Sequence, residues 1–156
     1  MTKHIAVIGP SDCSSTERDD AYKIGAMLAA RGSVLICGGG SGVMEAASKG
    51  ARSENGVVIG ILPGDDSGAG NPYLTYAIAT GLSEARNAII ARTADALIAV
   101  GGEYGTLSEI ALAMKMGKKV ILLNSWGLHP ARPADKMPLI AHSAVEAVNM
   151  SGGRGC

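Results

Sequence analysis

Short aliphatic runs alternate along the chain with longer stretches in which apolar residues recur every three or four positions. The short runs predict β-strands at residues 4–8, 33–37, 57–61, 95–100 and 119–123, with a weaker strand at 74–78. The longer stretches predict helices at residues 15–31, 42–54, 82–93, 106–117 and 139–150. This alternation is typical of an α/β fold with three layers, in which helices cover both faces of a parallel sheet. We expect one such domain at residues 1–150 and a flexible tail at residues 151–156.

Glycine gathers where the second and the fifth of these strands end. The first turn contains Gly38, Gly39, Gly40, Ser41 and Gly42, and the second contains Gly101, Gly102, Gly105 and Thr106. Backbone N–H groups can converge in such turns, and the helix that follows adds the positive end of its dipole. Because parallel strands end at one edge of a sheet, both turns are expected to meet Gly9 and Ser11 there and to bind a phosphate-bearing ligand. Tight packing alone is the alternative for either turn.

Two familiar nucleotide motifs are absent. The turn after the first strand has the single glycine Gly9, and Val43 stands where a third glycine would complete GxGxxG in the next turn. No GxxxxGK[ST] motif occurs either. The sequence therefore favours neither nicotinamide redox chemistry nor ATP hydrolysis.

Arg86 is the cation that we expect beside the glycine turns. It lies near the start of helix 82–93, and its planar guanidinium suits a phosphate that accepts two hydrogen bonds. The alternative is a surface residue paired with Glu84 or with another neighbour. Ser11, Asp12 and Ser41 could orient the remainder of the ligand.

Glu109 has two interpretations, which the sequence leaves open. It follows Thr106 by three residues, the same spacing as Ser14 and Glu17, so each pair could form a capping box at a helix start. Glu109 could instead act as an acid or a base beside the ligand. Residues 63–72, the longest segment without a predicted element, are likewise either a binding loop or a solvated connector.

Composition narrows the classes of partner. Fourteen basic and fourteen acidic residues balance, there is no Phe, and the aromatic residues are one Trp and four Tyr, so we expect no nucleic-acid partner. No apolar run is long enough to span a membrane. The three cysteines, Cys13, Cys37 and Cys156, form no CxxC pair, which argues against a disulfide framework and a metal site and favours a cytoplasmic protein. Cys37 is expected in the core.

Several stretches together resemble the LOG-like Rossmannoid superfamily, which includes the LONELY GUY phosphoribohydrolases and the molybdenum cofactor carrier proteins. The resemblance extends over roughly residues 4–124 and is carried by residues 38–47, 58–63, 86–87, 94–96 and 101–109. It implies a Rossmann-like fold. In the hydrolases, the signature PGGxGTxxE and an upstream arginine supply the catalytic pair that releases a base from a nucleoside monophosphate. By this resemblance, the pair would be Arg86 and Glu109.

Two departures from the hydrolase pattern favour the carrier branch. Val100 stands in place of the proline, and Asn87 follows the arginine in place of lysine. The resemblance then implies a homo-oligomeric binding protein for a phosphate-bearing cofactor or nucleotide, with the molybdenum cofactor as cargo and Asn87 in the site. The alternative function is a nucleoside 5′-monophosphate phosphoribohydrolase. An apolar surplus around residues 88–99 and 110–114 could supply the oligomer interface.

Overall fold

A computed structural model of the chain describes residues 1–152. Its strands are β1 (His4–Ile8), β2 (Val34–Cys37), β3 (Val58–Leu62), β4 (Tyr76–Ala79), β5 (Ala96–Val100), β6 (Lys119–Leu123) and β7 (Leu139–Ala141). Its helices are α1 (Ser15–Ala30), α2 (Val43–Ser53), α3 (Asn87–Thr93), α4 (Tyr104–Lys115) and α5 (Ala144–Gly152), with short 3₁₀ helices η1 (Ser67–Ala69) and η2 (Ser83–Arg86). Among the described helices, none is long and apolar enough to cross a membrane.

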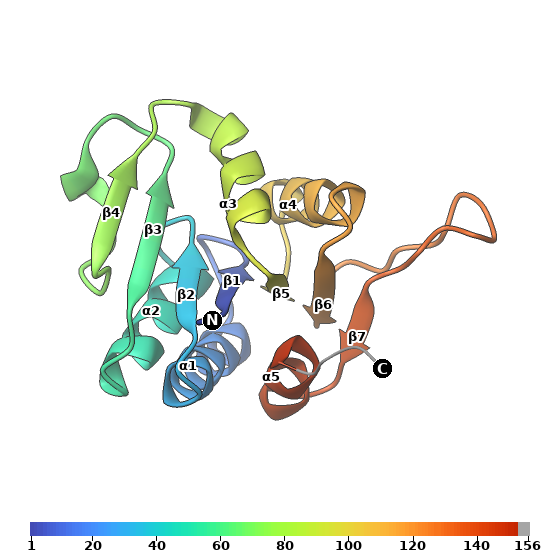
Figure 1. Cartoon of the computed structure of the whole chain (residues 1–156), viewed down its shortest axis with the longest axis horizontal. Helices are drawn as coiled ribbons and strands as arrows, with labels where there is room; N and C mark the ends of the chain where they lie inside the picture. Colours follow the sequence, from blue (N-terminus) through green and yellow to red (C-terminus); the bar gives the residue numbers. More distant parts are fainter. Residues whose placement is uncertain (153–156) are drawn as a thin grey trace.

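All the strands pair in parallel, in the order β4-β3-β2-β1-β5-β6-β7. Helices α1, α2 and α5 cover one face of the sheet, and α3 and α4 cover the other (Figure 1). Side chains alternate between the two cores: Ile5 and Val7 of β1 pack toward the first group of helices, and Ala6 and Ile8 toward the second. This is the three-layer, Rossmann-like α/β fold that the sequence predicted.

The C-terminal part of the chain differs from the prediction of one helix at 139–150. Residues 139–141 form the edge strand β7, which pairs with β6 in the register Ile121 to Leu139. Helix α5 begins only after Ser143, whose hydroxyl accepts a hydrogen bond from the Glu146 N–H at 3.1 Å. Three apolar residues are too few to distinguish a strand from the first turn of a helix. The Ser-x-x-Glu capping signal at 143–146 would have located the true helix start.

The predicted tail at 151–156 is also partly wrong. Ser151 and Gly152 belong to α5, and Ser151 is buried, with its hydroxyl donating to the Val148 carbonyl at 2.8 Å. Residues 153–156, including Cys156, lie outside the described part of the chain.

Helices α1 and α2 pack closely because each presents a glycine to the backbone of the other. A Cβ at Gly25 would collide with the Ala47 carbonyl, and one at Gly50 with the Tyr22 carbonyl. The predicted capping box at the start of α1 is confirmed: Glu17 N–H donates to Ser14 Oγ at 3.1 Å, and Ser14 N–H donates to Glu17 Oε2 at 3.0 Å. The glycine contacts allow the middle of α1 to pack against α2, and the capping box fixes the start of α1.

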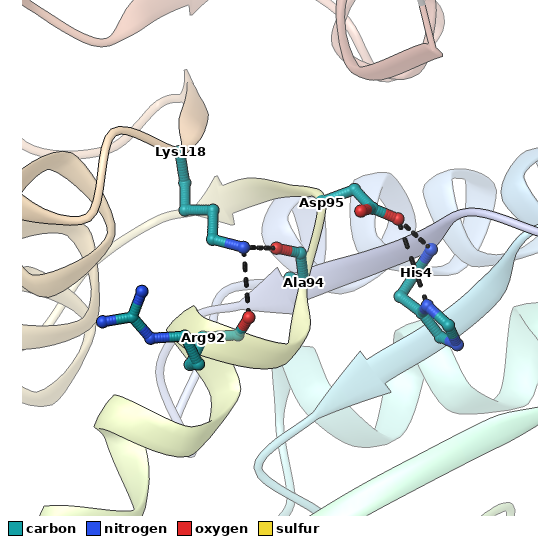
Figure 2. A network of polar contacts seen from close by, with 5 residues as sticks. All are labelled: His4, Arg92, Ala94, Asp95 and Lys118. Atoms are coloured by element: carbon teal, nitrogen blue, oxygen red, sulfur yellow. Dashed lines mark hydrogen bonds and ion pairs between the residues drawn. The ribbon is translucent and has the colours of Figure 1, made fainter.

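Polar contacts tie the strands together at the edge where β1, β5 and β6 begin (Figure 2). Lys118 Nζ donates to the carbonyls of Arg92 and Ala94, at 3.1 and 2.7 Å, and so satisfies carbonyls at the C-terminal end of α3. The His4 N–H donates to Asp95 Oδ2 at 2.8 Å. These structural contacts hold together the starts of β1, β5 and β6.

Candidate functional site

A pocket of about 610 Å³ opens where β1 and β5 end. Its walls come from the β1–α1 turn, the N-terminal end of α2, the residues after β3, the segment from η2 into α3, and the start of α4. The lining residues are Gly9, Ser11, Met44, Pro63, Gly64, Ser83, Glu84, Arg86, Asn87, Glu103, Gly105, Thr106 and Glu109. Strands β1 and β5 are neighbours whose chains continue to opposite sides of the sheet, which is where ligands bind in open α/β sheets.

Arg86 is partly buried at the wall of this pocket, next to the first glycine turn. A Cβ at Gly38 would collide with Arg86 Nη1, so the guanidinium occupies space that a side chain at Gly38 would fill. Arg86 Nε is buried and has no hydrogen-bond partner among the described residues. Nor does Arg86 form an ion pair within that part of the chain, so the alternative of a surface pair with Glu84 is wrong. An unsatisfied, permanently charged donor is therefore present at the site.

The helix predicted at 82–93 is divided at Arg86. Residues 83–86 form η2, and α3 begins at Asn87. Ser83 has φ 50°, a left-handed conformation that an α-helix does not accommodate. Arg86 therefore lies at the junction of the two helices.

Glu109 lies in the same pocket and is only 8% exposed. Burial disfavours its charged form and raises the pKa of the carboxyl from 4.5 to about 7, and the Arg86 guanidinium opposes that rise. The predicted capping box with Thr106 is wrong. Helix α4 begins at Tyr104, with Glu103 as its N-cap residue, so Thr106 and Glu109 both lie inside the helix. Glu109 is thus a buried acid at the ligand side of α4.

The first turn of α4 presents unsatisfied backbone donors to the pocket. Its N-cap residue makes no side-chain cap hydrogen bond, and the first N–H to bond back to Glu103 is that of Leu107. Gly105 and Thr106 line the pocket at this helix end. Backbone N–H groups and the positive end of the helix dipole therefore meet Arg86 here, an arrangement that favours an anion.

Asn87 fixes the position of η2 and α3 relative to α4. Its Nδ2 donates to Ser108 Oγ at 2.9 Å, and that hydroxyl donates to the Gly105 carbonyl at 2.6 Å. Asn87 is buried and lies beside Arg86 in the chain. The chain of hydrogen bonds holds the guanidinium at a set place relative to the N-terminus of α4.

Gly38 and Gly39 of the first glycine turn are buried behind the pocket wall, whereas Ser41 and Gly42 line a second cavity beside the pocket. Gly38 faces Arg86, and Gly39, with φ 76°, packs against Leu62. Asn71, at the end of the 63–72 loop, supports the turn: its N–H donates to the Gly39 carbonyl at 2.8 Å and its Nδ2 to the Gly40 carbonyl at 3.0 Å. The structure assigns these glycines close contacts rather than a direct place at the pocket surface.

A sulfur atom supports the same turn from the core. The Gly39 N–H lies 3.3 Å from Cys37 Sγ, which is also 3.6 Å from Ser48 Oγ. Cys37 is fully buried, as the sequence predicted, and burial raises the pKa of its thiol. Cys37 is therefore a structural, uncharged residue beneath the site.

Some of the other predicted residues in the two glycine turns make packing contacts, and others line the pocket. Ser41 Oγ donates to the Ser11 carbonyl at 3.2 Å, and Gly42, with φ 65°, packs against the Pro10 and Ser11 carbonyls. A Cβ at Gly101 would meet the Glu17 carboxylate, and one at Gly102 would meet the Trp126 ring. Gly101 and Gly102 thus serve packing, whereas Gly105 and Thr106 reach the pocket.

Some of the residues that line the pocket were not identified from the sequence. They are Met44, Pro63, Gly64, Ser83, Glu84 and Glu103. Pro63 and Gly64 begin the 63–72 loop, for which the sequence leaves open a binding loop or a solvated connector. Ser83 and Glu84 belong, like Arg86, to η2. Across residues 1–152, no group of three or more His, Cys, Asp or Glu side chains is placed to hold a metal ion.

The parallel sheet, its strand order and the helices on both of its faces define a Rossmann-like α/β protein with a pocket at the switch point. The model of the SLOG cluster4 family matches residues 2–149, and the chain belongs to this family, within the LOG-like Rossmannoid superfamily.

Relatives of two kinds match by sequence. A protein of Archaeoglobus fulgidus is 49% identical over 119 residues, which cover 76% of this chain and 78% of the relative. A probable cytokinin riboside 5′-monophosphate phosphoribohydrolase of Oryza sativa subsp. japonica is 35% identical over 119 residues. That match covers 74% of this chain and 49% of the rice enzyme, so the chain corresponds to about half of its length.

Solved structures match over almost the whole chain. The molybdenum cofactor binding protein of Rippkaea orientalis superimposes with a TM-score of 0.89 at 38% identity, covering 96% of this chain and 95% of that protein. The molybdenum cofactor carrier protein of Chlamydomonas reinhardtii gives a TM-score of 0.81 at 31% identity, covering 96% and 95%.

The buried Glu109 makes stability depend on pH. With a pKa of about 7 in the folded state and 4.5 ordinarily, it binds its proton more readily when folded. The resulting stabilisation is complete below pH 4.5 and is lost as the pH rises through about 7. We expect the free energy of unfolding of the wild type, relative to Glu109→Gln, to fall by roughly 3 kcal/mol between about pH 5 and about pH 8. Urea unfolding at both pH values measures this difference, and parallel pH profiles for the two proteins would contradict it.

Proposed function

We propose that this protein is a carrier-like binding protein for a phosphate-bearing cofactor or nucleotide. The observation that carries the proposal is the buried Arg86 Nε without a partner, in a pocket that Gly105 and Thr106 of the uncapped α4 terminus also line. A buried donor left unsatisfied is costly, and a phosphate oxygen would satisfy it with a charge-assisted hydrogen bond.

The cargo that fits the proposal best is the molybdenum cofactor, a pterin with a terminal phosphate. The similar proteins of Rippkaea orientalis and Chlamydomonas reinhardtii are molybdenum cofactor proteins, and each aligns with 96% of this chain. The pocket volume of about 610 Å³ lies within the range of small-molecule sites. The terminal phosphate would bind at Arg86 and the start of α4, and the pterin would extend along the edge of the sheet.

The cargo proposal gives Glu109 a passive role. At a pH below about 7 its carboxyl is mostly protonated and adds no negative charge to the phosphate site. The proton also lets it donate a hydrogen bond to an anionic ligand. Release of the cargo would then become easier as the pH rises and the carboxyl ionises.

We expect Arg86→Ala to weaken the binding of AMP or of a pterin monophosphate roughly 10- to 100-fold, because a charge-assisted hydrogen bond to a buried anion is lost. Isothermal titration calorimetry measures the change. Arg92→Ala is the matched control: Arg92 is an exposed arginine of α3, and its described contact is a backbone carbonyl at the far edge of the sheet.

The carrier proposal fails if the wild type is not thermally stabilised by nucleoside monophosphates, pterin monophosphates or the molybdenum cofactor. A ligand that fills the pocket must raise the melting temperature by mass action. Equal losses in Arg86→Ala and Arg92→Ala would place the anion site elsewhere.

Phosphoribohydrolase activity is the second candidate, favoured by the presence of Arg86 and Glu109 in one pocket. Arg86 would hold the 5′-phosphate. Glu109, with a pKa of about 7, would stabilise the positive charge that develops on the sugar or accept a proton from water. Water would add to the anomeric carbon as the bond to the base breaks, and the base would leave with a proton. The similarity to the rice phosphoribohydrolase, which covers 49% of that enzyme, supports this candidate.

We expect AMP to be recovered intact after incubation with this protein, under conditions in which a known phosphoribohydrolase releases adenine. Chromatography of adenine and ribose 5-phosphate tests this. Release of adenine by the wild type, lost in both Arg86→Ala and Glu109→Gln, would replace the carrier proposal with the enzyme.

We also propose that the protein is cytoplasmic and homo-oligomeric, with an interface other than the surface at residues 88–99 and 110–114 that the sequence suggested. Ile110 and Ala113 are buried in the chain's own core, as is most of 88–99. Tyr76 and Ile78 of β4 are 62% and 48% exposed. They pair with Ile59 and Ile61 of β3, whose side chains face the α3 and α4 side. That uncovered part of the sheet is the interface we favour.

We expect Ile78→Lys to shift the protein toward the monomer, because a charge on the uncovered sheet face would have to be desolvated on association. Sedimentation equilibrium measures the mass, with Val145→Lys, an exposed apolar position of α5 on the other face, as control. A monomeric wild type would contradict the oligomer proposal.

A further inference from the structure

A second cavity of about 540 Å³ adjoins the candidate site between the first two turns of α1 and of α2. Arg18, Asp19 and Tyr22 of α1 line it on one side, and Glu45, Ala46 and Lys49 of α2 on the other. Tyr73, from the segment between β3 and β4, and residues 11–13 and 41–42 complete the wall. Ser11 lines both cavities. The contact of Ser41 Oγ with the Ser11 carbonyl therefore stands at the boundary between them.

The charged groups of this cavity are not paired with one another. Glu45 and Lys49 have the i, i+4 spacing that usually gives an ion pair on a helix, yet no such pair forms within the described residues. Lys49 Nζ lies instead 5.9 Å from the centre of the Tyr73 ring. Glu45, which is half-buried on the rigid first turn of α2, therefore keeps both carboxylate oxygens available as acceptors.

The two oxygens of a carboxylate match a ligand edge that presents two adjacent donors. A 2-amino-4-oxopyrimidine ring, the ring that guanine and pterins share, offers a ring N–H next to an amino group. Adenine presents a ring nitrogen acceptor beside its amino group, and hypoxanthine lacks the second donor. Two parallel charge-assisted hydrogen bonds therefore become possible only with the 2-amino-4-oxo edge.

We propose that the second cavity binds a 2-amino-4-oxopyrimidine heterocycle through Glu45. This inference rests on the proposed function, because the phosphate of the same ligand would occupy the first pocket at Arg86. The ligand would pass Ser11 at the boundary of the two cavities, and the Tyr73 and Tyr22 rings would offer apolar surface to the heterocycle. Glu45 thereby selects the ligand, whereas Arg86 binds the group that all phosphorylated ligands share.

A structural role for Glu45 makes a different prediction. An acidic residue in the first turn of a helix interacts favourably with the helix dipole. Loss of that interaction would lower the thermal stability of the protein equally with every ligand and would not change which ligand it prefers.

The test compares ligands that carry the 2-amino group with analogues in which hydrogen or an oxo group replaces it. GMP and IMP form one pair, and a pterin monophosphate and its lumazine analogue form the other, which distinguishes a nucleotide source from a pterin source. By calorimetry we expect the amino-bearing member of at least one pair to bind about tenfold more tightly to the wild type. We expect Glu45→Gln to bring the two members within about twofold, since an amide offers one acceptor oxygen in place of two.

Glu54→Gln, at the exposed C-terminal end of the same helix, is the matched control and should keep the wild-type preference. Ligands recovered after titration are checked to be intact. Equal binding within both pairs by the wild type would overturn the inference and leave the proposed phosphate binding standing. The inference would also be overturned if Glu45→Gln kept the wild-type preference for the amino-bearing ligand and only its melting temperature were lower. If none of the four ligands binds, the proposed function fails and the inference fails with it.

Discussion

The divergence of the chain after β1 and β5 is the constraint on which the site depends. The two strands are neighbours, but one continues into α1 on one face of the sheet and the other into α4 on the opposite face. The ends of the two strands lie very close together at the opening between these helices. A Cβ at Gly9 would collide with the Val100 carbonyl and with the Val43 side chain. A larger residue at Gly9 would separate β1 from β5 and displace α2, and the pocket would lose its floor.

Three acidic residues surround a single cation in the pocket lining. The burial of one of them, Glu109, keeps the pocket compatible with an anionic ligand. Glu84, Glu103 and Glu109 all line it with Arg86. Glu84 and Glu103 are exposed, so water screens their charges, whereas Glu109 is buried and its pKa of about 7 leaves much of it neutral at physiological pH. An incoming phosphate dianion favours the protonated carboxyl further. The proposed binding of a phosphate would therefore be linked to proton uptake at Glu109, and the protonated acid would have to lose its proton before it could serve as a base.

Local signals in the sequence were sufficient for the parts of the structure that short-range interactions determine. The strands other than β7, the Ser14 cap and the meeting of both glycine turns at one edge follow from periodicity, turn chemistry and parallel pairing. The sequence also placed Arg86 and Glu109 near one site, though it could not choose between a cap and a buried acid for Glu109. That choice depends on α4 beginning two residues earlier than Thr106, where the Glu103 carbonyl accepts a hydrogen bond from Trp126 Nε1 at 3.1 Å. Such a contact joins residues 23 apart and leaves no local trace.

The first glycine turn shows why a motif alone cannot assign a binding role. Glycine leaves room both for a ligand to approach the backbone and for a protein side chain to do so, and a sequence does not distinguish these uses. At Gly38 the group that approaches is the Arg86 guanidinium, and the Gly39 and Gly40 carbonyls are bonded to Asn71. For the proposed phosphate, these glycines would act through Arg86, because they set how deeply the guanidinium lies in the wall. Because a guanidinium half-withdrawn from water has few other partners, its attraction for a phosphate is stronger than that of an exposed arginine. The anion-binding groups of the site are therefore one cation and one helix terminus, and the glycine turn holds that cation in the pocket wall.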